Sequence, residues 1–514
     1  AQGYSTGDPL TKVTGLNVEV GGTNNVGFLR NSQNALPTAN INTNAMVLNN
    51  TTIGDTFNFD SSATGSALIR SDVHEVILDK DITVGATGIQ NSLMQAGNDG
   101  KVTLASGKTI TSTTANEFYG MTAGNFAGAG GDGKKATAEN KGILNIAGNK
   151  SLGMAIDVDD EGINNGTITF TGTNGAGAYN TGTFTAKSGS SINVNTPGQN
   201  SIGVFNSGTL TINNGATITG TAKDATGIYA TGGTATNNGT ISMTAEKAKG
   251  LVTDKAGTTT GNIINNGTVS VTGTESVGAA ALDGTITAAA GSISASGPSG
   301  ITLYTGGTTG GTITATGGTI DATNGAINVY ADKGTIKFNG ATINTGSGSL
   351  AFMKGSNGGI VNFNSATTAN IATNGTAFYI PPTVSPIPTT PTYSAFTGLT
   401  GAALTGFNNL NNLTLSMSPN SNLAVASYVQ TKVSDLAASS IGSLVATVTG
   451  INYNDYLLYK SELTADAGTT YAQFKKIALS NSSIINNTNL KLQYCFLSFV
   501  NIFLLLLSLI HISE

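Results

Sequence analysis

The fold is decided by residues 165–170, which read Asn-Gly-Thr-Ile-Thr-Phe. Ile168 and Phe170 alternate with Thr167 and Thr169, and this period of two places the apolar pair on one face of a half-buried strand. The preceding Asn-Gly favours a turn, because both residues tolerate positive φ at little cost. Close variants of this unit recur at residues 207–212, 238–243, 266–271, 284–288, 311–315 and 334–338.

A glycine followed by apolar residues marks a second repeat, which falls between copies of the first. The clear marks are Gly153, Gly177, Gly203, Gly227, Gly250 and Gly278, and looser ones follow at Gly300, Gly325, Gly348 and Gly375. Their intervals are 24, 26, 24, 23, 28, 22, 25, 23 and 27 residues, with a mean near 24.7. Earlier in the chain, Gly27, Gly88 and Gly120 resemble the same mark with insertions. Two marks that stay in step over this length indicate a repeat architecture.

This repeat length predicts an all-β fold, namely a single-stranded parallel β-helix solenoid. A hairpin meander or a sandwich would repeat every 8–12 residues or so. About 25 residues instead suit one coil of three short strands and three turns, and coils stacked ~4.8 Å apart bury a shared apolar core. Ten marks predict nine coils and a rod of roughly 43 Å.

The predicted β-helix covers residues 61–380 and is flanked by regions of different character. We expect residues 1–60 to form an irregular N-terminal cap, because a bare edge strand at the end of a solenoid invites aggregation. The five prolines from Pro381 to Pro391 predict an extended linker over residues 381–391.

Beyond the linker, the pattern predicts an α-rich region over residues 392–490. Apolar residues recur mostly at intervals of three or four after Ser421, a candidate N-cap, and residues 454–479 also read as helical. The apolar tail, residues 491–514, includes 18 uncharged residues from Cys495 to Ile512, just enough to span a membrane. Its abrupt change of composition favours a non-native extension over an anchor.

The composition excludes several classes of function. Only 10% of the 514 residues are charged and the net charge is −5, so the chain has no electrostatic footprint for nucleic acid. One cysteine and two histidines exclude a Cys/His zinc site and a disulfide framework. The 39% of hydrophobic residues and the lack of like-charge blocks argue against disorder.

The sequence predicts no catalytic residue, no cofactor and no strong metal site. The weak metal candidates are Asp157, Asp159, Asp160 and Glu161, which begin like an EF-hand loop. The twelfth position of such a loop needs a bidentate glutamate and is Ile168 here, so a solvated acidic turn is the favoured interpretation. His74 is the one histidine outside the apolar tail, and no Gly-x-Ser-x-Gly elbow accompanies it.

Aromatic residues recur in step with the glycine marks and should therefore stack from coil to coil. Tyr179, Phe205 and Tyr229 lie two residues after their marks, and Tyr304, Phe352 and Tyr379 lie four after, which is the same strand face by parity. An outward stack could form a platform for glycans. An inward stack would be core, and that is the favoured interpretation.

The repeat style resembles the passenger regions of Gram-negative autotransporters, the type V secretion proteins, especially the large adhesin-like ones. The resemblance rests on the Asn-Gly-Thr units at Gly166, Gly208, Gly239 and Gly267 with the glycine marks between them, and it covers roughly residues 80–380. It implies a right-handed parallel β-helix displayed at the cell surface, associated with the outer membrane. It also implies a C-terminal translocator barrel in the full-length chain, whose alternating strands of ~10 residues are not recognisable in 392–514.

We therefore expect a surface-displayed or secreted structural or adhesive protein that is not an enzyme. Its expected partners are glycans or proteins of a host or bacterial surface, contacted in part through outward rows of Thr, Ser and Asn. One alternative is a β-helix polysaccharide lyase or hydrolase, which needs converging carboxylates. Residues 163–375 hold seven acidic residues, and they are scattered. The other alternative, a membrane-anchored protein of the surface-layer type, depends on the apolar tail.

Overall fold

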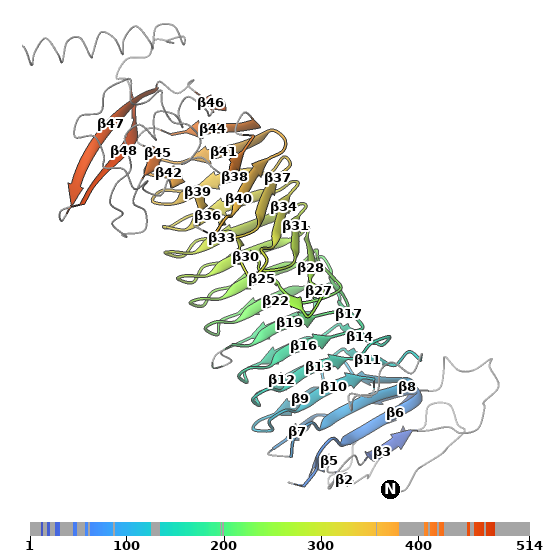
Figure 1. Ribbon diagram of the computed structural model, residues 1–514. Coiled ribbons are helices and arrows are strands. Elements are labelled where there is room, and N and C mark those ends of the chain that lie inside the picture. Colours follow the sequence, from blue (N-terminus) through green and yellow to red (C-terminus); the bar gives the residue numbers. More distant parts are fainter. Residues whose placement is uncertain are drawn as a thin grey trace, which may run out of the picture.

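The computed structural model describes residues 62–379 apart from 86–87, 125–133, 196, 198–199 and 356, followed by 406–409, 412–418 and 421–425. At the two ends it describes the backbone of short strands within 12–59 and 450–478. The described residues form β-strands and no α-helix. They make a parallel β-solenoid of about 11 turns, a rod of stacked coils (Figure 1). The predicted fold class is thereby confirmed for the repeat region.

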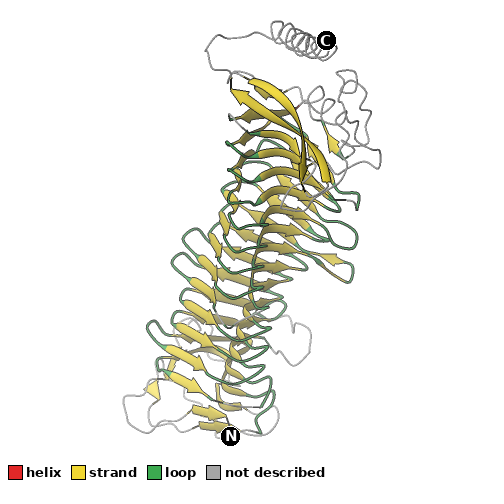
Figure 2. Cartoon of the chain, turned by 90° about the vertical axis from the view of Figure 1, so that its left-hand side faces the viewer, coloured by secondary structure: helices red, strands yellow, loops and turns green. Residues whose placement is uncertain are grey.

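Each coil contributes one strand to each of three faces, which we name A, B and C. Figure 2 shows the strands of successive coils lying one above the other, with the turns stacked along the edges. Strands of faces A and B belong to one 30-stranded sheet, and face C is a separate 14-stranded sheet. Neighbouring coils pair in parallel without a shift, as Thr167 pairs with Ser191 and Phe170 with Val194.

The strands of face A are β10 (Tyr119–Ala123), β13 (Leu152–Ile156), β16 (Ala176–Asn180), β19 (Ile202–Asn206), β22 (Thr226–Ala230), β25 (Lys249–Thr253), β30 (Val277–Ala281), β33 (Ile301–Thr305), β36 (Ile327–Ala331), β39 (Leu350–Lys354) and β42 (Thr376–Tyr379). Those of face B are β11 (Thr137–Asn140), β14 (Glu161–Asn164), β17 (Thr183–Ala186), β20 (Thr209–Ile212), β23 (Thr234–Asn237), β28 (Asn262–Asn265), β31 (Thr285–Ala288), β34 (Thr312–Ala315), β37 (Thr335–Phe338), β40 (Ile360–Phe363) and β43 (Phe407–Asn408). Those of face C are β7 (Ile82–Val84), β9 (Thr109–Ser112), β12 (Ile143–Ile146), β15 (Thr167–Phe170), β18 (Ser191–Val194), β21 (Thr217–Gly220), β24 (Thr240–Met243), β29 (Thr268–Val271), β32 (Ser292–Ala295), β35 (Thr319–Ala322), β38 (Thr342–Thr345), β41 (Thr367–Ile371), β44 (Leu413–Met417) and β46 (Gly450–Asn452).

Near the N-terminus, faces A and B merge into two long strands, β6 (Ala67–Leu78) and β8 (Ser92–Leu104). The first half of β6 pairs with β3 (Val26–Arg30) and its second half with β4 (Ala45–Leu48), both in parallel. The remaining strands here are β1 (Lys12–Val13), β2 (Val18–Val20) and β5 (Phe57–Phe59). The ladder thus continues into residues 1–60, and their role as a cap stays a prediction.

The predicted α-rich region is not confirmed. Beyond β42, the expected helix start at Ser421 is wrong, because this buried serine immediately precedes strand β45 (Asn422–Val425), and its hydroxyl donates to the carbonyl of Ser418 at 2.7 Å. Residues 454–479 were expected to be helical, but β47 (Leu457–Asp466) and β48 (Thr469–Ala478) pair antiparallel over ten residue pairs. Alternation in Leu-Leu-Tyr-Lys-Ser-Glu-Leu-Thr-Ala-Asp suits that strand. The linker 381–391 and the tail 491–514 lie outside the described residues.

The core is a stack of equivalent side chains from every coil. On face C, the inward column includes Ile168, Ile192, Ile218 and Ile241, all fully buried. Full burial of one such side chain contributes about 1.5–3 kcal/mol. The Asn-Gly-Thr units supply strands to two faces, since residues 167–170 lie on face C and residues 209–212 on face B.

Buried asparagines pair between neighbouring coils at three levels of the rod. The amide of Asn140 donates to Asn164 at 2.8 Å, that of Asn180 to Asn206 at 2.7 Å, and that of Asn237 to Asn265 at 2.7 Å. These side chains are fully buried, and a buried amide needs such partners to offset its desolvation.

The glycine mark has a steric cause on face A. The register of adjacent A strands skips the glycine, as Ile202 pairs with Thr226 and Val204 with Ile228. A Cβ on Gly203 would lie 2.6 Å from the carbonyl oxygen of Gly227 and 2.7 Å from a methyl of Ile218. This position therefore points into the core, and the next residue also faces the core.

The looser marks from Gly300 onward are a wrong assignment. The register aligns Gly278 with Thr302, two residues after Gly300, and the next coil has Asn328 there. Both side chains are fully buried and bond to face C. The Thr302 hydroxyl donates to the backbone carbonyl of Asp321 at 2.8 Å, and the side-chain amide of Asn328 donates to the backbone carbonyl of Asn344 at 2.8 Å. Among the early marks, Gly27 and Gly120 occupy the predicted position, while Gly88 precedes its strand.

Candidate functional site: the outer side of face A and its turns

The aromatic residues Tyr179, Phe205 and Tyr229 lie on the outside of face A, so the predicted core placement is wrong for them. Each occupies the fourth position of its strand and is half-buried, whereas the third and fifth positions are buried. The physical reason is the backbone path: two consecutive residues, here the glycine and its successor, face inward, so the residue that follows them faces outward.

The later aromatic residues divide between the two sides. Tyr304 and Tyr379 are half-buried on the outside, but Phe352 is fully buried and contacts Phe363 at 5.3 Å between ring centroids. The parity argument failed here because Gly300, Gly348 and Gly375 are not equivalent to Gly278. The core prediction was therefore right for Phe352 alone.

The outer fourth positions form one continuous column through the register of face A. In order they are Tyr179, Phe205, Tyr229, Val252, Ala280, Tyr304, Tyr330 and Met353. The two small residues in the middle, Val252 and Ala280, are buried, with only 2% and 4% of their surface exposed. The half-buried first positions Ile202, Val277 and Ile301 lie beside this column. We call these residues together the apolar strip.

The rings in the first part of the column stack on one another. Tyr179 and Phe205 have centroids 4.6 Å apart and planes 5° apart, and Phe205 and Tyr229 follow at 6.0 Å and 26°. Tyr304 meets Tyr330 edge to face at 5.5 Å and 68°. Sugar rings pack on exposed aromatic faces, and here neighbouring rings cover those faces. The column therefore resembles a stabilising ladder more than a glycan platform.

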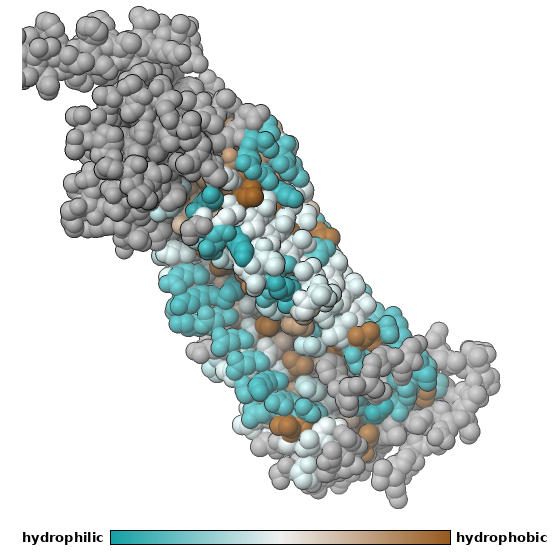
Figure 3. All heavy atoms as spheres, in the orientation of Figure 1, coloured by the Kyte–Doolittle hydropathy of each residue, from teal (hydrophilic) through white to brown (hydrophobic). Residues whose placement is uncertain are grey.

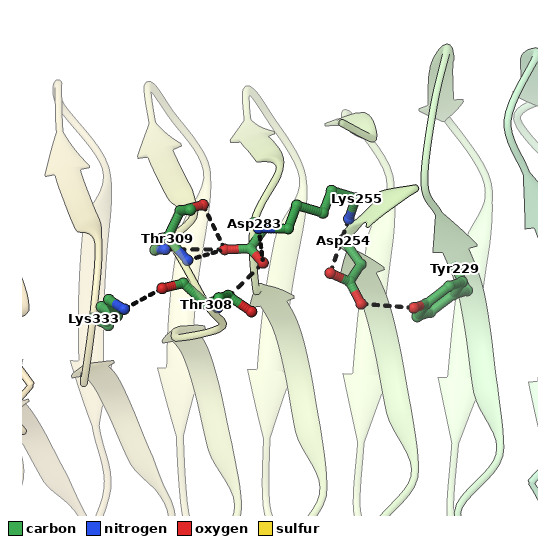
Figure 4. A network of polar contacts seen from close by, with 8 residues as sticks. Tyr229, Asp254, Lys255, Asp283, Thr308, Thr309 and Lys333 are labelled. Carbon is green, nitrogen blue, oxygen red and sulfur yellow. Dashed lines mark hydrogen bonds and ion pairs between the residues drawn. The ribbon is translucent and has the colours of Figure 1, made fainter. Parts of the chain in front are cut away.

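The turns between faces A and B run beside this column and carry a polar network (Figure 4). One turn is enlarged by an antiparallel hairpin, β26 (Lys255–Ala256) with β27 (Thr259–Thr260). Another is the loop of residues 306–311. The short turn between them contains Asp283, whose side chain is only 3% exposed. The 28-residue interval between Gly250 and Gly278 was the sequence signal for the hairpin; nothing in the sequence indicated the role of Asp283.

Asp283 joins the two enlarged turns. Its Oδ1 accepts the backbone N–H of Thr309 at 2.5 Å, the Thr309 hydroxyl at 2.7 Å and the N–H of Gly310 at 3.1 Å. Its Oδ2 accepts the N–H of Thr308 at 3.2 Å and pairs with Lys255 Nζ at 3.2 Å. Lys333 of a later turn donates to the carbonyl of Thr308.

This arrangement keeps Asp283 ionised. Burial by itself raises the pKa of its carboxyl, but the Thr309 hydroxyl, the N–H groups of Thr309 and Thr308, and Lys255 outweigh burial and hold the pKa well below its ordinary value. On the same side of the rod, the Tyr229 hydroxyl donates to Asp254 at 2.8 Å. Burial, that hydrogen bond and the charge of Asp254 raise the pKa of Tyr229 to about 12.

The geometry of this cluster favours a structural role over acid–base chemistry. A general acid needs a raised carboxyl pKa near the working pH, and Asp283 has the opposite shift. The carboxylate oxygens of Asp254 and Asp283 both accept hydrogen bonds from neighbouring groups. Asp254 accepts them from the Tyr229 hydroxyl and from the backbone N–H of Lys255. These hydrogen bonds hold neighbouring turns together beside the apolar strip.

Three of the weak metal candidates lie in the turn between β13 and β14, Glu161 is the first residue of β14, and the four carboxylates have different partners. Asp160 accepts the N–H of Ala136 in the preceding coil at 2.7 Å, and Glu161 pairs with Lys135 at 2.8 Å. Asp157 accepts the N–H of Val158, and Asp159 has a positive φ of 70° in the turn. In the described part of the chain, no group of three or more His, Cys, Asp and Glu side chains could hold a metal ion. His74 lies within β6 with a positive φ of 66°.

The outer sides of faces B and C differ from the strip in chemistry. On face B, a column in register contains Thr183, Thr209, Thr234, Asn262, Thr285, Thr312 and Thr335. On face C, hydroxyl and amide groups bond from coil to coil, as Ser191 does to Thr167 at 3.1 Å and Thr219 to Asn193 at 2.7 Å. The predicted outward Thr, Ser and Asn rows are therefore present.

Comparison with known proteins gave no relative: no family model matches the chain, and no curated protein or solved structure matches it significantly. A search of the described residues for a helix long and apolar enough to cross a membrane found none. The fold and its surfaces are therefore the basis on which a function can be proposed.

Proposed function

We propose that this protein is a non-catalytic, surface-displayed structural or adhesive rod, the passenger of a Gram-negative autotransporter. The observation that carries the proposal is the uninterrupted stack of about 11 coils whose B and C faces present neutral hydroxyl and amide groups in register. The repeat style of the sequence supports the assignment to the autotransporter passengers.

Such faces suit adhesion by many weak contacts. A hydroxyl or an amide both donates and accepts hydrogen bonds, which matches the groups on glycans and on polar protein surfaces. One contact contributes little, but a rigid rod presents the same group at every coil, and linked weak contacts raise the overall affinity by orders of magnitude. Glycans or proteins of a host or bacterial surface are the partners that this chemistry favours.

Glycan binding and cleavage can be separated with the purified full chain. We expect binding to a subset of a glycan array and no release of reducing sugar from the same glycans. Replacing Thr209, Thr211, Thr234 and Thr236 by Ala on face B, or Thr217, Thr219, Thr240 and Ser242 on face C, should identify the binding face by a loss of signal. Each set is the matched control for the other, because all eight side chains lie outside the core.

Two results would contradict this function. Release of reducing sugar by the full chain would favour the lyase or hydrolase alternative. No signal on the array, together with no attachment of protein-coated beads to cells, would remove adhesion and leave only a structural role. Display itself is tested by protease treatment of intact producing cells, which should remove the rod.

A further inference from the structure

The sequence contains nine Asn-Gly pairs, and all of them lie between strands of the described rod. They begin at Asn165, Asn174, Asn214, Asn238, Asn266, Asn324, Asn339, Asn357 and Asn374. In such a pair, the backbone nitrogen of glycine can attack the side-chain carbonyl carbon of asparagine, because glycine has no side chain that hinders the approach. The attack needs an amide that can turn toward this nitrogen and a backbone N–H that can lose its proton. Hydrogen bonds to either group therefore slow the reaction.

Six of these pairs are restrained by hydrogen bonds between or within coils. In four of them the asparagine side chain is bonded, through the contacts Asn165 to Glu139 at 2.8 Å, Asn174 to Asn149 at 3.2 Å, and Asn266 to Asn238 at 2.9 Å. In four the glycine N–H is a donor: Gly239 to the Asn237 side chain at 3.1 Å, Gly267 to the Asn237 carbonyl at 3.0 Å, Gly325 to the Ser349 hydroxyl at 3.2 Å, and Gly375 to the Ala372 carbonyl at 2.8 Å. Two of the pairs carry both restraints.

A seventh pair, Asn357-Gly358, is restrained by a single carboxylate. Both of its residues are exposed, and the Asn357 amide donates to the two oxygens of Asp332 at 3.0 and 2.9 Å. Asp332 belongs to the turn of the preceding coil that follows β36. This contact is therefore what separates an exposed Asn-Gly pair from an unrestrained one.

The pairs Asn214-Gly215 and Asn339-Gly340 carry neither restraint. All four residues are exposed, and the two glycines have positive φ, 81° at Gly215 and 119° at Gly340. Within the described part of the chain, no hydrogen bond is made by either asparagine side chain or by the N–H of either glycine. A Cβ added to Gly340 would have no neighbour closer than 3.8 Å, so this turn has space for a rearrangement.

We propose that Asn214 and Asn339 are sites of spontaneous deamidation by way of a cyclic succinimide. The backbone nitrogen of Gly215 or Gly340 loses its proton and forms a bond to Cγ of the preceding asparagine. The Cγ–Nδ2 bond breaks, and the amide nitrogen leaves as ammonia. Water then opens the ring. Its attack at Cγ gives aspartate, and its attack at the backbone carbonyl carbon gives isoaspartate, in which the chain continues through the side chain.

The modification changes the charge at one edge of the rod. Asn214 lies between β20 of face B and β21 of face C, and Asn339 lies between β37 and β38 of the same faces. Each product is a carboxylate that is ionised at pH 7, because the carboxyl pKa is near ~4. On the side of the rod drawn in Figure 3, broad areas of near-neutral hydropathy separate the hydrophilic patches. The edge between faces B and C therefore becomes more acidic as the protein ages, while the coils stay stacked because both turns are exposed.

The first test follows all nine pairs in the folded full chain during incubation at mildly alkaline pH. Digestion with pepsin in acid and mass spectrometry should show that peptides with Asn214 and Asn339 gain about 1 Da, as an amide NH2 becomes a hydroxyl. The other seven should convert at least about fivefold more slowly, the factor that corresponds to a hydrogen bond of about 1 kcal/mol that must first break. In guanidinium chloride the nine rates should become similar, because the restraints belong to the fold.

The second test releases a restrained pair. Asp332→Ala removes the acceptor of the Asn357 amide, so Asn357 should then convert about as fast as Asn339. The matched control is Asp254→Ala, which removes the aspartate that follows strand β25 as Asp332 follows β36 and which contacts none of the nine pairs. It should leave all nine rates unchanged. Circular dichroism melting verifies that both variants remain folded.

Three results would overturn the proposal. Asn214 and Asn339 could stay intact in the folded chain while the denatured chain converts, or all nine pairs could convert equally fast in the folded chain. Asn357 could also stay intact in Asp332→Ala, which would show that the hydrogen bonds do not control the reaction. None of these results bears on surface display or on glycan binding by freshly prepared protein, so the proposed function is tested separately.

Discussion

The coils that carry glycine at the inward position of face A differ instructively from those that follow. From Gly153 to Gly278 a glycine occupies this position. Neighbouring atoms lie so close to it that they would overlap a Cβ. From Thr302 onward a side chain occupies it, and Thr302 and Asn328 bond to the carbonyls of face C. In the next two coils the position is occupied by the buried Ala351 and Ala377, which form no such bridge. The same backbone path is thus maintained with glycine, with a polar bridge across the interior, or with alanine.

Where the two kinds of coil meet, hydrogen bonds between their turns link them on the outside of the rod. Asp283 lies in the turn that follows β30, the last face A strand with a glycine at the inward position. Its partners Thr308, Thr309 and Gly310 lie in the turn that follows β33, the strand that has Thr302 at that position. The hydrogen bonds that Asp283 accepts from these residues, together called the clamp, therefore join the coil of Gly278 to the coil of Thr302.

The largest expected effect comes from adding a side chain to a glycine coil. Gly203→Val should destabilise the rod by more than about 3 kcal/mol, because its Cβ would overlap the carbonyl oxygen of Gly227 and its branches the side chain of Ile218. Thermal unfolding followed by circular dichroism measures this. Gly189→Val, at a turn position with nothing near its Cβ, controls for the loss of glycine itself, although its positive φ adds a smaller penalty. Equal costs at the two sites would contradict the close-approach explanation.

Removing a bridge from the second kind of coil should cost less. Asn328→Ala deletes donors to the carbonyl of Asn344 and to the Thr345 hydroxyl and leaves these buried groups without that partner. We expect a loss of about 2–3 kcal/mol in the free energy of unfolding. Asn328→Gly, which imitates the first kind of coil, should not restore stability, since the bonds to face C are still missing. A fully stable glycine variant would show that the bridges are dispensable.

The clamp at the junction should be sensitive to pH. Asp283→Asn should cost about 1–3 kcal/mol at pH 7 through its hydrogen bonds. Because the folded pKa of Asp283 lies below its unfolded value near ~4, the stabilisation is complete above that value and is lost as the pH falls through the folded pKa. Unfolding free energies of wild type and variant, measured in urea from pH 7 to pH 2 or so, should converge at the acid end. A constant difference would contradict this linkage.

The smallest expected effect is that of Tyr229→Phe, on the glycine side of the junction. It removes one hydroxyl from Asp254 and retains the ring, so the loss should be about 1 kcal/mol. Phe205 provides the control, because its ring has no hydroxyl and Phe205→Tyr should be close to neutral. Ultraviolet titration of the tyrosines should show the group near pH 12 disappear in Tyr229→Phe.

The alternation of Thr with Ile or Phe and the repeat of about 25 residues were enough to predict the parallel β-solenoid. They were not enough to place the aromatic column. Tyr179 and Phe205 were expected inside, although the residue after each glycine mark is also apolar and alternation alone does not decide the face. In the structure, the backbone turns the glycine and its successor inward, and the aromatic residue that follows lies outside. Strand β47 was expected to be helical because apolar residues spaced by three or four coexist with alternation in the same short stretch.

For the candidate site, the sequence predicted that aromatic residues stack from coil to coil, and the 28-residue interval between Gly250 and Gly278 is the signal that could have indicated the hairpin insertion. It could not indicate that Asp283 meets Thr309, because those residues come from different coils and nothing in their local sequence is unusual. It also could not distinguish Gly278, which lies at the inward position, from Gly300, which lies two residues before it.

By itself, the sequence determined that the chain winds into stacked coils. The alternation of apolar and polar residues and the spacing of the repeats are local properties that are present in every repeat. Only the tertiary structure decided which side of face A the aromatic rings occupy and which charges meet across the turns. Those outcomes depend on how one coil sits on the next, where a shift of one residue exchanges the inside and the outside.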